Sequence, residues 1–227
     1  MSQSSEKPVN ILLVVGAGCP HCHLVSRHLH QLSKEGRITH LETIRLDEKP
    51  ELVQQLAIRS VPWLRVGPFE LEGSLSLHEL RQWIERVNHP RGLAIYFDDL
   101  FSRGQRHKVE SLVRKNPSWL QAFVQLLGDE EVGINTRLGV GVVLEEIADS
   151  GLAAAIVHEL GEICHHPSPR LRGDACYYLP WTRSSQALPY LQACLNDPHP
   201  DVREAALEAL ETLESTLAGC ISEEKGS

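Results

Sequence analysis

The chain has 227 residues, of which 42% are hydrophobic and 23% charged, a globular composition that excludes an intrinsically disordered protein. The length allows one large domain or two of ordinary size. Residues 1–90 hold equal numbers of acidic and basic side chains, so the net charge of −8 comes from residues 91–227. This shift favours a boundary between domains 1–90 and 91–227, and the acidic second half argues against nucleic acid or an anionic membrane as partner.

The N-terminus shows no pattern of an export signal. Residues 1–8 are polar, and the apolar run over 9–15 is shorter than a secretory h-region and ends in glycine. No run approaches the ~20 apolar residues of a membrane span. We therefore expect a cytoplasmic protein without a membrane partner, whose six cysteines are catalytic or buried thiols and not a disulfide framework.

A Cys-x-x-Cys motif, Cys19-Pro20-His21-Cys22, follows the apolar run and a Gly-Ala-Gly turn. The apolar positions that come next lie at helical steps: Cys22, Val25, Leu29 and Leu32. The pattern predicts a strand over 9–15, a tight turn and then a helix. Two cysteines separated by two residues at such a turn suit dithiol–disulfide chemistry.

The other elements expected in the first ninety residues are a strand over 38–46, a helix over 50–57, a strand within 58–66, a strand over 69–72 and a helix capped by Ser76. The last helix is expected to bury Leu77, Leu80, Ile84 and Val87. The order is β-α-β-α-β-β-α.

This order resembles the α/β thioredoxin fold over residues 8–88, because Val61-Pro62 also follows Cys22 by forty residues and Gly73 follows the hairpin. The resemblance implies that Pro62 is a cis-proline and that the Val61 backbone pairs with an extended protein substrate. It implies protein thiols and disulfides as substrates and no cofactor. Leu13 and Gly18 depart from the pattern, since thioredoxins have a buried acid and a tryptophan there.

The four residues of the motif have distinct expected roles. Cys19 is expected at the helix N-terminus, where unpaired N–H groups and the helix dipole favour a thiolate, so it is the nucleophile. Cys22 lies on the apolar face and resolves the mixed disulfide. Pro20-His21 is the dipeptide of DsbA-type thiol oxidases, and His21 would further stabilise the Cys19 thiolate. We expect a reduction potential less negative than the ~−270 mV of thioredoxin.

The same segment permits three other interpretations. With His23 it matches the Cys-x-x-Cys-His pattern of covalent haem attachment, which needs export. Cys19, His21, Cys22 and His23 could bind zinc, but no second ligand pair lies at a finger-like spacing. The cysteines could also be inert core residues, although a pair beside a proline at a helix start is a poor core motif. Dithiol chemistry without metal is the favoured interpretation.

Beyond a linker at 89–92 the chain predicts only helices, at about 104–115, 117–127, 132–149, 151–165, 171–179, 185–195 and 200–217. Residues 195–210 match residues 164–179, and Arg137, Arg172 and Arg203 recur at intervals of 35 and 31 residues. The signature resembles HEAT repeats and predicts an all-α HEAT-like domain. We interpret the three arginines as parts of the repeat framework and expect the array to dock a protein partner.

The cysteines of the second half are Cys164, Cys176, Cys194 and Cys220, and the simplest interpretation makes them core thiols. Cys164, His165, His166 and Cys176 could ligate a metal, but their spacing matches no familiar site.

Two hypotheses for the whole chain follow. In one, it is a thiol–disulfide oxidoreductase that acts through Cys19 and Cys22 on proteins docked by the repeats. In the other, it is a redox-sensing scaffold, in which the dithiol switches binding by the repeats.

Overall fold

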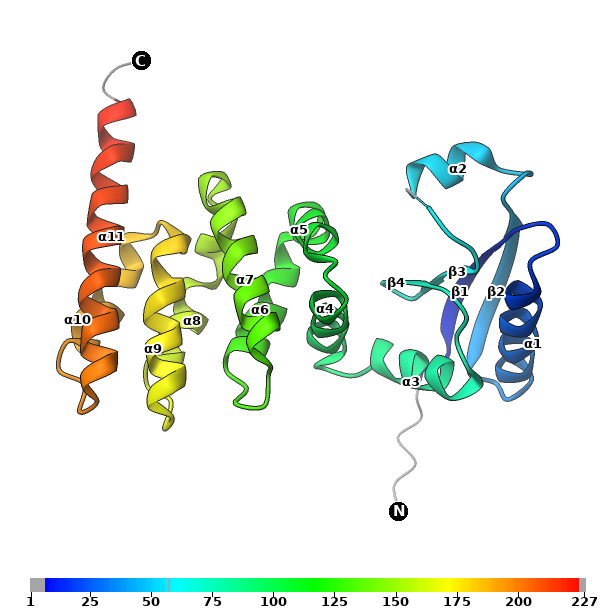
Figure 1. The fold of residues 1–227 in the computed structure, drawn as a ribbon, viewed down its shortest axis with the longest axis horizontal. Coiled ribbons are helices and arrows are strands. Elements are labelled where there is room, and N and C mark those ends of the chain that lie inside the picture. Colours follow the sequence, from blue (N-terminus) through cyan, green and yellow to red (C-terminus); the bar gives the residue numbers. More distant parts are fainter. Residues whose placement is uncertain (1–6, 57, 225–227) are drawn as a thin grey trace. The chain divides into compact units, whose positions relative to one another are not determined.

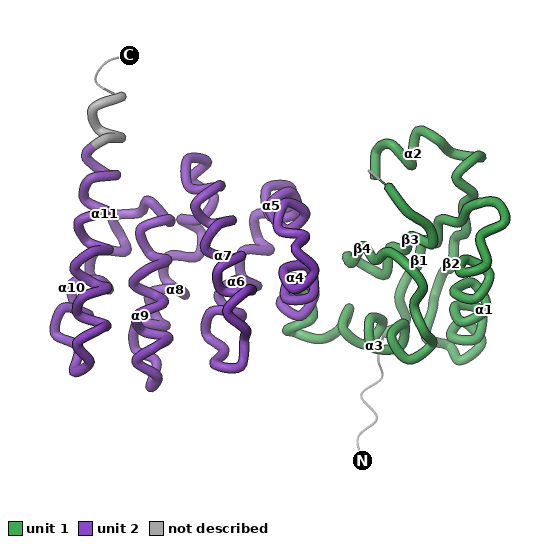
Figure 2. Tube along the Cα trace, viewed as in Figure 1, with its two compact units in different colours: residues 1–93 green, residues 94–227 purple. Residues whose placement is uncertain are grey.

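The computed structural model describes residues 7–56 and 58–224, without the side chains of residue 52 and of residues 219–224 (Figure 1). The chain divides into two compact units, unit 1 over residues 1–93 and unit 2 over residues 94–227 (Figure 2). Within the described ranges, none of the helices combines the length and the apolar character that a membrane span requires.

Unit 1 is built on a four-stranded sheet with the order β2-β1-β3-β4. Its strands are β1 (Val9–Val15), β2 (Ile38–Arg45), β3 (Trp63–Val66) and β4 (Phe69–Glu72). Strand β1 runs parallel to β2 and antiparallel to β3, and β3 and β4 form an antiparallel hairpin. This is the mixed sheet that the predicted β-α-β-α-β-β-α order requires. Strand β3 begins only after Pro62, which has no N–H to donate to a neighbouring strand.

The helices of unit 1 are α1 (Pro20–Lys34), α2 (Pro50–Gln55) and α3 (Leu77–Val87), and α1 contacts α3. The predicted helix over 50–57 ends at Gln55, and its Ala57 lies outside the described residues. Helix α3 starts in a capping box, in which Ser76 accepts from the Glu79 N–H and the Glu79 carboxylate accepts from the Ser76 N–H.

The residues that α3 buries differ in part from the predicted set. It consists of Leu80, Trp83 and Ile84, whereas Leu77 and Val87 are only half-buried. Trp83 is buried because its ring packs edge-on against the Phe69 ring of β4, with centroids 5.5 Å apart.

Unit 2 consists of helices in its described residues. The α-helices are α4 (Gly92–Ser102, which begins at the end of unit 1), α5 (Arg106–Lys115), α6 (Gln121–Leu127), α7 (Ile134–Ile147), α8 (Val157–Ile163), α9 (Pro169–Tyr178), α10 (Leu188–Cys194) and α11 (Pro200–Glu224). Short 3₁₀ segments join them: η1 (Pro117–Leu120), η2 (Ala148–Ser150), η3 (Leu152–Ile156), η4 (Leu179–Thr182) and η5 (Ser185–Ala187).

Two features of unit 2 differ from the predicted segments. Helix α4 lies between the predicted linker and the first predicted helix of the second half, where no helix is predicted. It buries Ala94, Tyr96, Phe97, Leu100 and Phe101. The predicted helix over 151–165 is a 3₁₀ segment, η3, followed by α8, and α8 ends at Ile163.

The repeat arginines have one structural role. Arg137, Arg172 and Arg203 each occupy the fourth position of their helix, α7, α9 and α11. Each guanidinium donates to backbone carbonyls of the loop that precedes its own helix: Arg137 to Leu127, Asp129 and Val132, Arg172 to His166 and Pro167, and Arg203 to Asp197 and Pro198. The prediction that they belong to the repeat framework is confirmed.

Candidate active site

Cys19 is the N-cap residue of α1, directly after the turn that leaves β1. Its backbone is extended, with φ −78° and ψ 110°, and Pro20 takes the first helical position, where a missing N–H costs nothing. Gly18 before it has φ +69°, a left-handed conformation that glycine adopts without strain. The glycine turn and the proline therefore place the Cys19 sulfur at the helix N-terminus.

The two sulfurs of the motif lie at disulfide distance, with Cα atoms 5.3 Å apart. Cys22 is only 3% exposed on the apolar face of α1, whereas Cys19 is half-buried. The Cys22 N–H donates to the Cys19 sulfur over 3.2 Å. A thiolate on Cys19 would thus receive a first-turn N–H and the positive end of the helix dipole, which stabilise negative charge.

The Val61–Pro62 loop lies against this turn. The peptide bond between the two residues is cis, as the thioredoxin resemblance implies. The Val61 carbonyl oxygen lies 4.0 Å from the Cys19 sulfur, and Pro62 is buried while Val61 is half-buried. A Cβ on Gly16 would come within 3.1 Å of Val61 Cγ2, so the glycine permits the close approach of the two loops.

The other two residues of the motif are exposed to solvent. Pro20 and His21 are exposed in the first turn of α1, and His23 is exposed after them. The support of the Cys19 thiolate by His21 remains a prediction. On the inner side, Leu13 is fully buried at the position where thioredoxins carry an acid.

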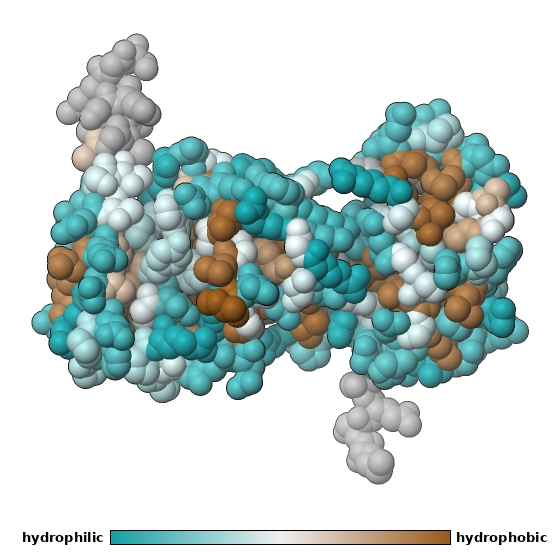
Figure 3. All heavy atoms as spheres, viewed as in Figure 1, coloured by the Kyte–Doolittle hydropathy of each residue, from teal (hydrophilic) through white to brown (hydrophobic). Residues whose placement is uncertain are grey.

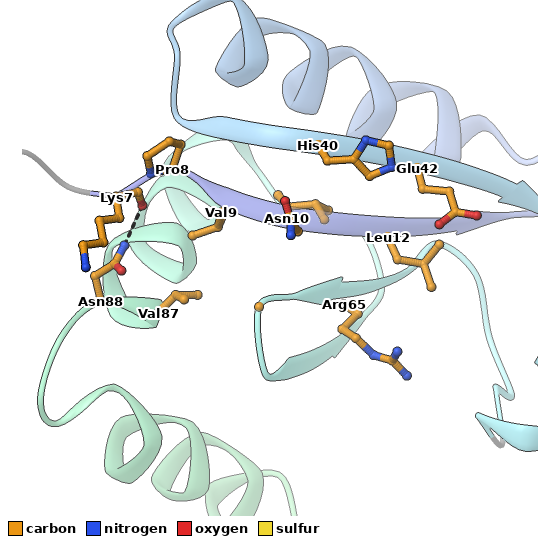
Figure 4. Close-up of a pocket in the computed structure, with 12 residues that line it drawn as sticks. Lys7, Pro8, Val9, Asn10, Leu12, His40, Glu42, Arg65, Val87 and Asn88 are labelled. Carbon is orange, nitrogen blue, oxygen red and sulfur yellow. Dashed lines mark hydrogen bonds between the residues drawn. The ribbon is translucent and has the colours of Figure 1, made fainter.

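A pocket of about 470 Å³ in unit 1 is shown in Figure 4, and its lining does not include Cys19 or Cys22. It follows the N-terminal half of β1, whereas Cys19 comes after the C-terminal end of that strand. His40, Glu42 and Arg65 reach it from β2 and β3, and Asn88 at its edge donates to the Lys7 carbonyl over 2.7 Å. We do not assign this pocket to the dithiol chemistry.

Three further cysteines meet in unit 2. Cys164, Cys176 and Cys194 are buried, and their sulfur atoms all lie within 4.8 Å of one another. Hydrogen bonding with Cys176 and Cys194, together with burial, raises the pKa of Cys164. Hydrogen bonds from Cys164 and Cys176 lower the pKa of Cys194. The interpretation of these cysteines as core thiols is confirmed for all three, but their spacing in the sequence gave no sign that the three sulfurs meet.

Cys220 was also predicted to be a core thiol, and its side chain lies outside the described residues. The metal set considered from the sequence, Cys164, His165, His166 and Cys176, is not the group that the fold assembles, since Cys194 takes the place of the histidines.

Comparisons with known protein families agree with both halves of this description. Residues 9–85 match the family model described as a thioredoxin domain. Residues 157–218 match the model described as HEAT repeats, a span that includes Arg172 and Arg203 but not Arg137. A search of curated proteins found no match to the chain. The chain is thus a thioredoxin-like domain fused to C-terminal HEAT-like repeats.

Proposed function

We propose that the chain performs thiol–disulfide exchange on protein substrates through Cys19 and Cys22. The observation that carries this proposal is the asymmetry of the pair at the N-terminus of α1. Cys19 is half-buried and its sulfur accepts a hydrogen bond from the Cys22 N–H, whereas Cys22 is only 3% exposed. An attacking thiolate and a protected resolving thiol need these two environments.

In the first step, the Cys19 thiolate attacks one sulfur of a substrate disulfide. A bond forms between Cys19 and that sulfur, the substrate S–S bond breaks, and the other substrate sulfur leaves as a thiolate that takes a proton from solvent. The Val61 backbone, 4.0 Å from the Cys19 sulfur, is in position to pair with the substrate chain.

In the second step, Cys22 resolves the mixed disulfide. Its thiolate attacks the Cys19 sulfur, the bond to the substrate breaks, and the substrate leaves with both cysteines reduced. The two electrons come from the Cys19–Cys22 dithiol, which ends as a disulfide. A second dithiol, from a small thiol or a protein reductant, must reduce it again before another turnover.

The proposed setting is the reducing cytoplasm, where a dithiol with a stabilised thiolate rests in the reduced form. Stabilisation of the thiolate favours the reduced state and makes the potential less negative. Equilibration with a glutathione redox buffer measures it. A value at or below the ~−270 mV of thioredoxin would contradict the proposed stabilisation of the thiolate at the helix N-terminus.

The HEAT-like repeats are proposed to dock the protein partner. Unit 2 exposes large apolar side chains on α7, Ile134 at 65% and Leu138 at 58%, one turn apart on the same face. Figure 3 shows hydrophobic side chains gathered in a strip over α7. Exposed apolar surface of this kind is typical of a protein contact. Tethering a docked partner to the dithiol would raise its effective concentration at Cys19.

Mixed-disulfide capture tests the proposal most directly. Cys22→Ser leaves the first step intact and removes the second, so substrates remain bonded to Cys19 and are identified by mass spectrometry. The matched control is Cys19→Ser/Cys22→Ser, which captures nothing through this site. Ile134→Glu/Leu138→Glu in the Cys22→Ser background tests docking. If the repeats dock partners, this variant should capture fewer of the proteins that Cys22→Ser captures. If they do not, it should capture the same proteins in the same amounts.

The second candidate function is a redox-sensing scaffold, which the fusion of a dithiol to partner-binding repeats favours. An insulin-reduction assay with a supplied reductant separates the two. Turnover well above the uncatalysed rate supports the oxidoreductase. One equivalent of oxidation per chain without turnover, together with a change in partner binding, supports the sensor.

A further inference from the structure

We propose that Cys164, Cys176 and Cys194 form a binding site for a soft, thiophilic metal ion in the HEAT-like unit. The site is separate from the Cys19–Cys22 pair and does not depend on the exchange function. Cys164 directly follows α8, Cys176 lies within α9 and Cys194 is the last residue of α10. Each of these three helices contacts the other two, so the three ligands come from three helices that pack together.

The spacing of the sulfur atoms suits a shared ion. All three lie within 4.8 Å of one another. Metal–thiolate bonds of about 2.3 Å place sulfur atoms bonded to one ion roughly 3.8–4.0 Å apart. Small adjustments of the side chains around an ion therefore suffice to complete the site.

The surroundings of the sulfurs select the class of ion. Cys164, Cys176 and Cys194 are 5%, 0% and 4% exposed, so water reaches the site poorly. Thiolates are soft donors that prefer Cu(I) and Zn(II) to magnesium or calcium. Three thiolates also carry three negative charges, which an ion at their centre offsets and which would otherwise repel one another in a buried position.

The charged groups near the sulfurs bear on which of the two ions binds. Arg172 lies within α9, as Cys176 does, and Asp197 follows α10, which ends at Cys194. Arg172 and Asp197 form an ion pair, with 2.6 Å between the guanidinium Nε and a carboxylate oxygen. Zn(II) takes four ligands and so needs one donor besides the three sulfurs, and the exposed His165, which follows Cys164 in the chain, is the candidate to test. Three sulfurs alone satisfy Cu(I).

Packing alone does not require this arrangement. Each cysteine could fill its helix interface as a small apolar residue without its sulfur meeting the other two. A disulfide between any two of them would leave the third thiol outside the bond. A metal ion engages all three at once.

The test uses the full chain with Cys19→Ser, Cys22→Ser and Cys220→Ser, which leaves the three thiols as the only cysteines. The reduced protein is titrated without oxygen with Zn(II), and separately with Cu(I) against a coloured chelator. Elemental analysis after dialysis is expected to show about one ion per chain. Adding Cys176→Ser should weaken binding at least about tenfold, because one of three ligands is lost.

His165→Ala in the same background identifies the ion. Loss of Zn(II) binding by about tenfold with Cu(I) binding unchanged supports a zinc site completed by His165. Tight Cu(I) binding that His165→Ala leaves unchanged, with Zn(II) bound only weakly in both proteins, supports a three-sulfur copper site.

A second measurement keeps all three cysteine ligands, so it tests the proposal even if the Cys176→Ser variant does not fold. The folded three-thiol protein is treated with a thiol-alkylating reagent with and without metal, and modification of each cysteine is followed by mass spectrometry. Bound metal is expected to slow alkylation of Cys164, Cys176 and Cys194 together. If the folded protein retains neither ion, or alkylation is equally fast with metal, the thiols are core packing residues and the proposal is wrong.

Discussion

The two units hold cysteines in opposite settings. In unit 1, Cys19 sits at the N-cap of α1, half-buried, and a helix N–H points at its sulfur. In unit 2, Cys164, Cys176 and Cys194 are at least 95% buried and their nearest polar neighbours include one another. The same functional group therefore lies at a helix end in the site proposed for exchange and between helices in the site proposed for metal binding. Solvent access and the helix terminus are the physical differences that separate the two proposals.

Two ion pairs of unit 2 are more buried than the Arg37–Glu85 pair of unit 1. The Arg37–Glu85 pair in unit 1 is formed by side chains 34% and 45% exposed, and such surface pairs contribute little to stability. In unit 2, the side chains of Arg172 and Asp197 are 12% and 7% exposed, and Arg137 is 3% exposed beside Asp174. Loss of either of these two buried pairs should therefore cost more stability than loss of the Arg37–Glu85 pair.

The largest expected effect is on thiol exchange. Cys19→Ser removes the attacking sulfur and should lower insulin reduction at least ~1,000-fold, because a serine hydroxyl is not a nucleophile towards disulfides at neutral pH. Cys176→Ser is the matched control and should leave the rate within about twofold. Exchange that survives Cys19→Ser but not Cys176→Ser would reverse the assignment of chemistry to the two units.

Arg137→Ala should destabilise unit 2 by roughly 3–5 kcal/mol, because it leaves the Asp174 carboxylate and several loop carbonyls without their donor. Urea unfolding measures the change. Arg203→Ala is the matched control: Arg203 is the exposed counterpart in the last repeat, and its loss should cost about 1 kcal/mol or less. Equal losses of unfolding free energy in the two variants would show that burial does not determine how much a repeat arginine contributes to stability.

Asp197 should make unit 2 sensitive to acid. Its hydrogen bonds from Arg172 hold the pKa of the carboxyl below 3.8, its unperturbed value. The folded-state pKa is lower than the unfolded one, so the pair contributes stability above pH ~4 that is lost as pH falls through the folded-state value. Asp197→Asn should cost about 2 kcal/mol at pH 7.

The pH dependence is the control for this prediction. Urea unfolding is measured from about pH 2 to about pH 7, a range that spans carboxyl titration. Acid should lower the unfolding free energy of Asp197→Asn less than that of the unmodified chain. Parallel curves for the two proteins would mean that Asp197 does not contribute the acid sensitivity.

The smallest expected effect compares two serine N-caps. Ser76 accepts from the Glu79 N–H in a capping box, whereas Ser168 at the start of α9 makes no side-chain cap bond. Ser76→Ala should therefore cost about 1 kcal/mol, and Ser168→Ala at most about 0.5 kcal/mol, in thermal or urea unfolding. A larger loss at Ser168 would show that its hydroxyl has another role in the repeat.

The features that the sequence by itself determined are those with local causes. The Cys19–Cys22 spacing, the glycine turn and Pro20 place the motif at a helix start, because capping and φ preferences act within a few residues. Regular periodicity predicted α1 and α3. The recurring arginines predicted a repeat framework, and each of them reaches a carbonyl only a few residues away.

The tertiary structure alone decided the features that depend on distant contacts. Helix α4 is held by contacts with distant residues, since Phe97 packs near Trp119 and Phe123. Trp83 is buried because β4 brings Phe69 against it. Cys164, Cys176 and Cys194 are 12 and 18 residues apart in the chain, and only the packing of α8, α9 and α10 brings their sulfurs together. Helix packing sets such distances, and no local rule encodes them.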